Sequence, residues 1–258
     1  MSKENQITVL KFGSSVLRSD ADLALVVKEI ARWRWRGHRG HRVVAVVSAI
    51  GNTTDELTQR ARAISNRPVD SFIASLLATG ETESAALLGI ALNEAGIKAT
   101  VLDAVQAGLL TSGSTLDAAL KDVKTSVILN ALKTDVVVIP GFVGRDERNQ
   151  TTLLGRGGSD LSALFIAHQL GAECRLLKDV DGLYTSDPNS TADRVAERFE
   201  RVSYERTLRI GGAVVQRKAV EFAQAQQLSF FISSLDAQFA TEVGPFEDCI
   251  EQIEECAA

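Results

Sequence analysis

Short, uninterrupted apolar runs constrain the fold of this chain more than any other feature. Residues 43–47 read Val-Val-Ala-Val-Val, and residues 136–142 form a second such run. A strand that is apolar at every position, rather than at alternate positions, is buried on both faces. Segments with helical periodicity alternate with these runs, which is typical of a parallel sheet covered by crossover helices. We therefore predict an α/β fold, a three-layer αβα sandwich with a largely parallel central sheet.

The same patterns predict individual elements and one main domain. Strands are expected over residues 7–12, 42–47, 99–102, 135–139, 173–177 and 229–233. Helices are expected over residues 21–35, 55–64, 71–78, 81–95, 159–170, 203–210 and 214–226, and within 116–133. Residues 1–235 are expected to form one domain, and the acidic residues 236–258 an exposed tail or a terminal helix.

Charge and hydropathy argue against several classes of protein. The 258 residues carry a formal net charge of −5, without the basic surplus of a nucleic-acid-binding domain. Residues 32–42 mix cations with aromatic rings, which could suit RNA or a membrane surface, but the basic end of a helix is the simpler interpretation. No apolar run approaches the ~20 residues of a membrane span, and the first six residues lack the apolar core of a signal peptide. We expect a cytoplasmic protein that binds a small molecule, with no nucleic-acid or membrane partner.

The three cysteines, Cys174, Cys249 and Cys256, are far apart in the sequence and accompany no histidine cluster. This pattern argues against a disulfide framework and against a zinc site, and it fits a reducing compartment. We predict no set of protein metal ligands.

The loop at residues 151–160, Thr-Thr-Leu-Leu-Gly-Arg-Gly-Gly-Ser-Asp, is the richest candidate for a binding site. It lies between an apolar strand and a helical pattern, so Ser159 and Asp160 fall in the first helical turn. Glycines let a ligand approach the backbone, and a helix start offers unpaired N–H groups. Arg156 adds a planar fork that suits a carboxylate or a phosphate. The loop favours an anionic small molecule, although a capped helix after a tight turn would explain it equally well.

Two earlier strand ends carry related chemistry. Lys11 lies at the end of the first strand and is followed by Gly13 and Ser14, so a lysine and loop amides could together meet a polyphosphate. The spacing is not that of a P-loop, and a surface lysine before a turn is the alternative. Ser48 and Thr53 follow the second strand as candidate ligand hydroxyls, and Thr54 or Asp55 could equally be no more than the N-cap of the next helix.

Two further segments complete the set of candidates. Glu81 is expected at the start of a helix, where it either complements the helix dipole or accepts a substrate ammonium group. Lys178 and Asp179 follow a predicted strand, and Tyr184 is a candidate wall for a flat ring. Turn chemistry alone would explain part of this last segment, but its length and polarity favour a ligand role.

These segments, in this order, resemble the amino-acid kinase superfamily, and within it the aspartokinases. The family's Lys-Phe-Gly-Gly-Thr/Ser-Ser opening is similar to residues 11–15, its Val-Ser-Ala-x-Gly-x-Thr-Thr stretch to residues 47–54, and its Gly-Glu pair to residues 80–81. Its Gly-Arg-Gly-Gly-Ser-Asp loop is matched in full by residues 155–160, and its Asp-Val-Asp-Gly-x-Tyr-Thr-x-Asp-Pro segment by residues 179–188. Five ordered motifs over most of residues 7–235 are far more specific than a single glycine loop.

The resemblance implies phosphoryl transfer from ATP to the side-chain carboxylate of L-aspartate, with Mg²⁺ bridging the phosphates and 4-phospho-L-aspartate and ADP as products. Lys11 would stabilise the moving phosphoryl group, and Asp160 would organise the charged groups around it. The residues implied for the amino acid are Ser48, Thr53, Glu81 for its ammonium, Arg156 for its α-carboxylate, and Ser159. Those implied for the nucleotide are Lys11, Gly13, Ser14, Lys178, Asp179, Tyr184, Asp187, Arg217 and Lys218. The substrate carboxylate is already a nucleophile, so catalysis would consist of alignment and charge neutralisation.

Two positions depart from the family's pattern. Ser14 stands at the family's second glycine, as it does in glutamate 5-kinases, so this loop does not choose between relatives. Ala213 stands where the family has a nucleotide-binding lysine, for which Arg217 or Lys218 would have to compensate from the next turn. A kinase of another acidic amino acid and a degenerate subunit that only binds ligands therefore stay open as alternatives.

The family resemblance also bears on assembly and regulation. Aspartokinases usually carry ACT regulatory domains after the kinase domain, and family members commonly form dimers. Residues 236–258 are too few for an ACT domain. We therefore expect a homodimer and no feedback inhibition by lysine or threonine through this chain.

Overall fold

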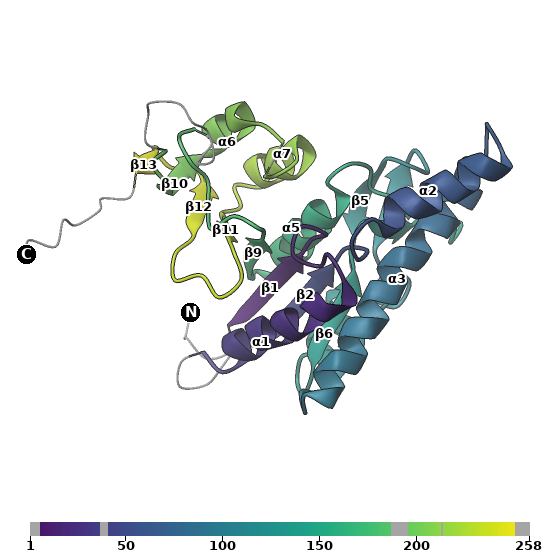
Figure 1. The fold of residues 1–258 in the computed structure, drawn as a ribbon, viewed down its shortest axis with the longest axis horizontal. Helices are drawn as coiled ribbons and strands as arrows, with labels where there is room; N and C mark the ends of the chain where they lie inside the picture. The colour runs from purple at the N-terminus through teal and green to yellow at the C-terminus, as the bar shows by residue number, and fades with distance from the viewer. Residues whose placement is uncertain (1–5, 37–40, 187–195, 213, 251–258) are drawn as a thin grey trace, which may run out of the picture.

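A nine-stranded sheet forms the centre of the fold (Figure 1). The structure is a computed structural model that describes residues 6–36, 41–186, 196–212 and 214–250. In spatial order the strands of this sheet are β13 (Cys249–Ile250), β10 (Phe199–Ser203), β12 (Thr241–Gly244), β11 (Phe230–Ser233), β9 (Glu173–Leu177), β1 (Ile7–Phe12), β2 (Arg42–Val47), β6 (Val136–Pro140) and β3 (Ala99–Val101). Within the described residues, the β10–β13 and β11–β12 pairs are antiparallel and the other neighbours are parallel.

Helices cover both faces of this sheet. The described helices are η1 (Asp20–Asp22), α1 (Leu23–Arg34), α2 (Thr53–Ile64), α3 (Asp70–Glu94), α4 (Thr125–Ala131), α5 (Gly158–Leu170), α6 (Tyr204–Ile210) and α7 (Arg217–Ala225). Val9 and Val44 pack in one hydrophobic cluster with α5 and α7, whereas Leu10 and Val43 pack in the other with α1 and the second half of α3. Adjacent residues of one strand thus fill two cores, which is why the runs are apolar throughout. The three-layer α/β prediction is confirmed.

A second, four-stranded sheet was not predicted. Its spatial order is β5 (Ala118–Asp122), β4 (Leu110–Gly113), β7 (Val143–Arg145) and β8 (Thr151–Leu153), and it packs beside α3. Within residues 116–133, where a helix was expected, the chain forms β5 first and only the short helix α4 after it. Strands of three to five residues are too short to show a clear alternation of apolar and polar positions.

The two helices predicted at residues 71–78 and 81–95 are one continuous helix, α3. Gly80 caused the wrong break, because glycine is a weak helix former. In the structure Gly80 is a packing position: a Cβ there would lie 2.9 Å from the Thr53 methyl group on α2. Among the described residues, no helix, including α3, is long and apolar enough to cross a membrane.

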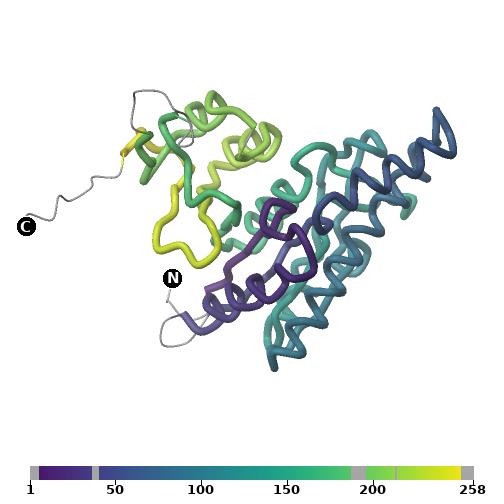
Figure 2. Tube along the Cα trace, viewed as in Figure 1, coloured from purple at the N-terminus to yellow at the C-terminus, as the bar shows by residue number. Residues whose placement is uncertain are grey.

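The prediction of an acidic tail or helix from residue 236 is wrong for the described part of that segment. β12 inserts into the large sheet, parallel to β10 and antiparallel to β11, and Thr241 and Val243 are fully buried. Figures 1 and 2 show the loop between β11 and β12, in yellow, beside α1. The domain therefore extends past residue 235, because three buried positions in a four-residue strand outweigh the acidic composition of the segment.

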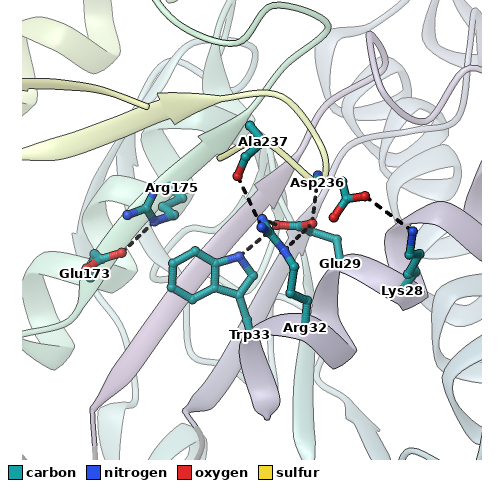
Figure 3. Close-up of polar contacts among 8 residues, drawn as sticks. All are labelled: Lys28, Glu29, Arg32, Trp33, Glu173, Arg175, Asp236 and Ala237. Atoms are coloured by element: carbon teal, nitrogen blue, oxygen red, sulfur yellow. Dashed lines mark hydrogen bonds and ion pairs between the residues drawn. The ribbon is translucent and has the colours of Figure 1, made fainter. Parts of the chain in front are cut away.

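Buried Glu29 connects α1 to this loop (Figure 3). Its carboxylate accepts hydrogen bonds from Trp33 Nε1 at 2.8 Å, from Arg32 Nη2 at 2.6 Å and from the Asp236 backbone N–H at 3.0 Å. The Trp33 ring is in turn stacked by Arg175, whose guanidinium lies 4.6 Å from the ring centroid. Trp33 of residues 32–36 is thus used inside the fold, and Arg32 and Arg34 lie in the last turn of α1, as the interpretation of a basic helix end expects.

Candidate active site

A cavity of about 830 Å³ opens at the carboxyl ends of β1, β2 and β9. The predicted site residues that line it are Lys11, Gly13, Ser14, Ser48, Glu81, Arg156, Ser159, Asp160, Lys178 and Asp179. Residues so distant in sequence meet there because parallel strands end at one edge of the sheet. Lys11 faces Leu176 of β9 in the strand register, so Lys178 follows β9 immediately beside it.

Asp160 lies between two lysines in this cavity. Lys11 Nζ is 2.7 Å from Asp160 Oδ1, and Lys178 Nζ is 2.8 Å from Asp160 Oδ2. All three side chains are at most 10% exposed. Two cations share one anion, so a net positive charge remains for a phosphoryl group, in surroundings where water screens it poorly.

The protonation states follow from burial and from these neighbours. Burial opposes ionisation of Asp160, but the charges of Lys11 and Lys178 outweigh burial and hold the pKa of Asp160 below its ordinary value. Burial lowers the pKa of Lys178, and the charge of Lys11 acts in the same direction, against Asp160. Removing the Asp160 carboxylate would therefore leave two buried cations without their shared counter-charge.

Glycines shape the loop that leads into α5. Gly155 and Gly157 have φ angles of 72° and 75°, in the left-handed region that favours glycine. This backbone leaves Arg156 exposed at the cavity and begins α5 at Gly158, with Ser159 and Asp160 buried in its first turn. The prediction that this loop opens a helix is confirmed, and its N-terminus faces the cavity through Ser159 and Asp160.

Glu81 lines the cavity from the middle of α3, not from a helix start. The side chain is buried, and its Oε2 has no hydrogen-bond partner. Burial raises the pKa of Glu81 to about 8, although the Ala49 backbone and the charge of Lys11 act in the opposite direction. A cationic group entering the cavity would satisfy this carboxyl, whereas a helix dipole cannot explain it.

Thr53 and Tyr184 are among the predicted residues that do not line the cavity. Thr53 Oγ1 donates a hydrogen bond to the Ile50 carbonyl at 2.7 Å. Its neighbour Thr54 lines the cavity instead. The Tyr184 hydroxyl donates a hydrogen bond to Asp181 Oδ1 at 2.7 Å, within its own loop. The geometry of α2 determines which of the two neighbouring threonines faces the cavity, and the sequence motif does not reveal this.

The other nucleotide candidates are separated from the cavity or not described. Arg217 and Lys218 line a smaller adjoining pocket of about 420 Å³. Arg217 pairs with Glu221 on the helix surface at 3.2 Å, and Lys218 Nζ lies 2.7 Å from Asp117. Asp187 and Ala213 lie outside the described residues.

Further residues line the cavity without having been predicted. They include Phe142, Val180, Val214 and Gln216. Gln216 immediately precedes α7, and its side chain packs against Gly157. Their position at the cavity depends on how separate loops fold against each other, which the motifs do not reveal, even for Val180 within residues 179–188.

The chemistry of the cavity fits a nucleotide polyphosphate better than a metal held by protein ligands. Among the described residues, no three His, Cys, Asp or Glu side chains form a metal-binding group. Mg²⁺ is commonly held by one or two carboxylates together with substrate phosphates. Asp179 lines the cavity and has the oxygen ligands that such an ion prefers.

Fold and cavity together place the chain in the class of three-layer α/β proteins whose site lies at the carboxyl ends of parallel strands. Within this class the chain belongs to the amino acid kinase family, whose family model matches residues 6–234.

The curated proteins to which this chain is similar are described more specifically, as aspartokinases. The chain is 38% identical over 219 residues to aspartokinase 2 of Bacillus subtilis, covering 83% of this chain and 53% of that protein. It is 36% identical over 243 residues to an aspartokinase of Geobacillus stearothermophilus, covering 92% of this chain and 58% of that protein. The chain thus spans little more than half the length of these relatives.

Solved structures agree with the fold. Aspartate kinase from Synechocystis superposes with a TM-score of 0.81 at 29% identity, covering 93% of this chain and 40% of that one. UMP kinase from Bacillus anthracis superposes with a TM-score of 0.65 at 15% identity, covering 96% of this chain and 99% of that one. The fold alone therefore does not choose the phosphoryl acceptor.

Proposed function

We propose that this protein transfers the γ-phosphoryl group of ATP to the side-chain carboxylate of L-aspartate, giving 4-phospho-L-aspartate and ADP. One observation carries the proposal: the cavity that holds the Lys11–Asp160–Lys178 cluster also holds the unpartnered, buried carboxyl of Glu81. The first group suits a phosphoryl group and the second suits an ammonium group. The aspartokinases at 36–38% identity favour aspartate as the acid.

In this proposal each residue has a distinct task. Lys11 and Lys178 neutralise the negative charge of the transferred group, while Asp160 fixes the positions of both ammonium groups. Glu81 accepts the substrate ammonium, and Arg156 pairs with the α-carboxylate through its planar fork. The side-chain carboxylate of the substrate is left to attack the γ-phosphorus, and the bond from that phosphorus to the bridging oxygen of ADP breaks. Asp179 would help to hold a Mg²⁺ ion that accompanies the nucleotide, and such an ion would supply further charge neutralisation.

The test is ATP-dependent formation of an acyl phosphate, trapped as a hydroxamate with hydroxylamine, with aspartate and with glutamate as acceptors. Lys11→Ala removes one buried cation of the cluster, and Lys28→Ala, an exposed lysine on α1, is the matched control. We expect aspartate hydroxamate from the wild type and from Lys28→Ala, and none above background from Lys11→Ala.

Other results would change the assignment. Preference for glutamate would move the proposal to a kinase of another acid. No product with either acid, from a protein whose thermal unfolding shows that it is folded, would overturn the proposal in favour of a subunit that only binds ligands.

We also propose a homodimer, a cytoplasmic location and a role in amino-acid biosynthesis. The dimer rests on the family resemblance and on the exposed apolar side chains Phe72 and Ile90 of α3, which are 72% and 66% exposed. The location is supported by Cys174 and Cys249, which are both free thiols. Sedimentation equilibrium tests the dimer, and a mass that stays at 27.7 kDa at all concentrations would contradict it.

A further inference from the structure

Lys218 is fully occupied by contacts outside the main cavity. Its Nζ lies 2.7 Å from Asp117 Oδ1, 2.8 Å from the Leu154 carbonyl oxygen and 3.2 Å from the Ala118 carbonyl oxygen. A lysine ammonium group has three N–H donors, and here each has an acceptor. No donor is left for a nucleotide phosphate, so the predicted nucleotide role does not fit the geometry.

The three acceptors belong to segments that surround the glycine loop. Leu154 directly precedes Gly155, and Asp117 forms an isolated antiparallel bridge with Leu154. Ala118 begins β5 of the small sheet. One ammonium group on α7 therefore joins that helix to the small sheet at the point where the chain leaves β8 for the substrate loop.

The loop itself is confined on two sides. A Cβ on Gly155 would collide with the Asp117 carboxylate, and a Cβ on Gly157 would collide with the Gln216 side chain. Asp117 is a direct partner of Lys218, and Gln216 lies two residues before it in the sequence. Lys218 thus connects Asp117 with the chain segment of Gln216, the two groups between which the loop is packed. Arg156 extends from that confined turn, so the direction of its side chain depends on how rigidly Asp117 and Gln216 confine the loop.

We propose that Lys218 is a positioning residue for the acid-binding loop at residues 155–159, acting through Asp117 and the Leu154 carbonyl. The proposal rests on the proposed function and assigns Lys218 to the acid substrate and not to the nucleotide. Without the ammonium group, Asp117 loses its partner and the Leu154 carbonyl loses a charged donor, so Arg156 is held less firmly for the α-carboxylate.

Steady-state kinetics of Lys218→Met test this assignment, with Lys121→Met as the matched control. Lys121 is an exposed lysine on the same small sheet, in β5. For Lys218→Met we expect the KM for aspartate to rise at least about tenfold, because a misplacement of about 1 Å in a positioning group can cost up to 100-fold. The KM for ATP should change less than about twofold, and Lys218→Arg should restore most of the loss, because its guanidinium can still donate to the same oxygens.

Hydrogen exchange of the loop amides provides a readout that does not need activity. Amides of residues 154–159 should exchange faster in Lys218→Met than in the wild type and in Lys121→Met. If Lys218→Met does not fold, Asp117→Asn removes the charged partner from the other side and should give the same pattern in a milder form.

Each result separates the two proposals. A rise in the KM for ATP alone would return Lys218 to the nucleotide, and unchanged kinetics with unchanged exchange would also overturn the inference. A wild type without phosphoryl transfer would overturn the proposed function, while faster exchange in Lys218→Met would still support the link between Lys218 and the loop.

Discussion

The backbone of Gly13 lies directly against the ammonium group of Lys11: a Cβ built on Gly13 would be 2.5 Å from Lys11 Nζ. Gly13 is not in the left-handed region, so its backbone conformation suits other residues. Glycine is therefore needed at this position because any side chain would occupy the space of the Lys11 ammonium group.

Gly13→Ala should reduce activity far more than stability. The lysine chain can bend away from the new methyl group, which costs little folding free energy but moves Nζ relative to Asp160. We expect kcat to fall roughly 10- to 100-fold, as for other small misplacements of a reacting group, and the unfolding free energy to change by less than about 1 kcal/mol. Hydroxamate assays and urea unfolding measure the two quantities. An unchanged kcat would show that catalysis does not depend on the position of Lys11 Nζ.

Asp160→Asn should destabilise the protein strongly. The substitution leaves Lys11 and Lys178 buried without their shared counter-charge, and breaking a buried ion pair from one side costs about 3–5 kcal/mol. The added change Lys178→Met removes one of the two stranded cations, so the double variant should be more stable than Asp160→Asn alone. Urea unfolding of both variants decides this, and equal stabilities would show that the two groups do not interact.

Glu81 should make both stability and substrate binding depend on pH. Its pKa is about 8 in the fold against an ordinary value of 4.5. Between these two pH values the native carboxyl retains a proton that the unfolded chain has released, so the free energy of unfolding falls as the pH rises through this window. The fall amounts to about 1.4 kcal/mol for each unit of the pKa difference. Glu81→Gln should remove this slope, whereas Glu83→Gln, an exposed neighbour on α3, should leave it unchanged.

The same ionisation of Glu81 should control how tightly the acid substrate binds. Only the charged carboxylate pairs with an ammonium group, so the KM for aspartate should fall as the pH rises towards 8 and should level off above it. Kinetics from pH 6.5 to 9 test this expectation, and Glu81→Gln should have a higher KM that varies less over that range. A KM for aspartate that is independent of pH in the wild type would contradict the assignment of Glu81 to the ammonium.

Glu29→Ala should destabilise the protein without changing kcat. The change removes the acceptor of the Trp33 indole and of the Asp236 backbone, and each unsatisfied buried donor costs about 1–3 kcal/mol. Lys28→Ala is the control, because Lys28 pairs with Asp236 only at the surface and such pairs contribute about 0–1 kcal/mol. Thermal and urea unfolding compare the two. Similar losses would mean that buried Glu29 does not hold the loop before β12.

The parallel part of the large sheet could be predicted because burial on both faces leaves a clear mark in the sequence. Residues 43–47 and 136–140 are apolar at every position, and both are strands in the structure. β7 and β8 could not be predicted, since each has three residues and their pairing depends on the loop between them. β12 was missed because the acidic composition of the surrounding segment hides its three buried positions.

The residues of the site could likewise be predicted only in part. Lys11, Asp160 and Lys178 could be placed together because strand ends and a helix start define their positions. Glu81 was identified by its motif, but the helix start expected there was wrong, since α3 continues through Gly80. Gln216 could not be found, because it reaches the cavity only where the segment before α7 packs on Gly157.

The position of β12 determines when this protein can finish folding during its synthesis. Within the described residues, β10 and β13 join the large sheet through β12. β10 and β11 leave the ribosome before β12 does, so the growing chain then has strand edges on both β10 and β11 that still lack their partner β12. Open strand edges are templates for pairing with other chains. A message that stops between codons 234 and 240 would therefore yield a product that contains β11 and the residues of the cavity but leaves strand edges on β10 and β11 open to aggregation.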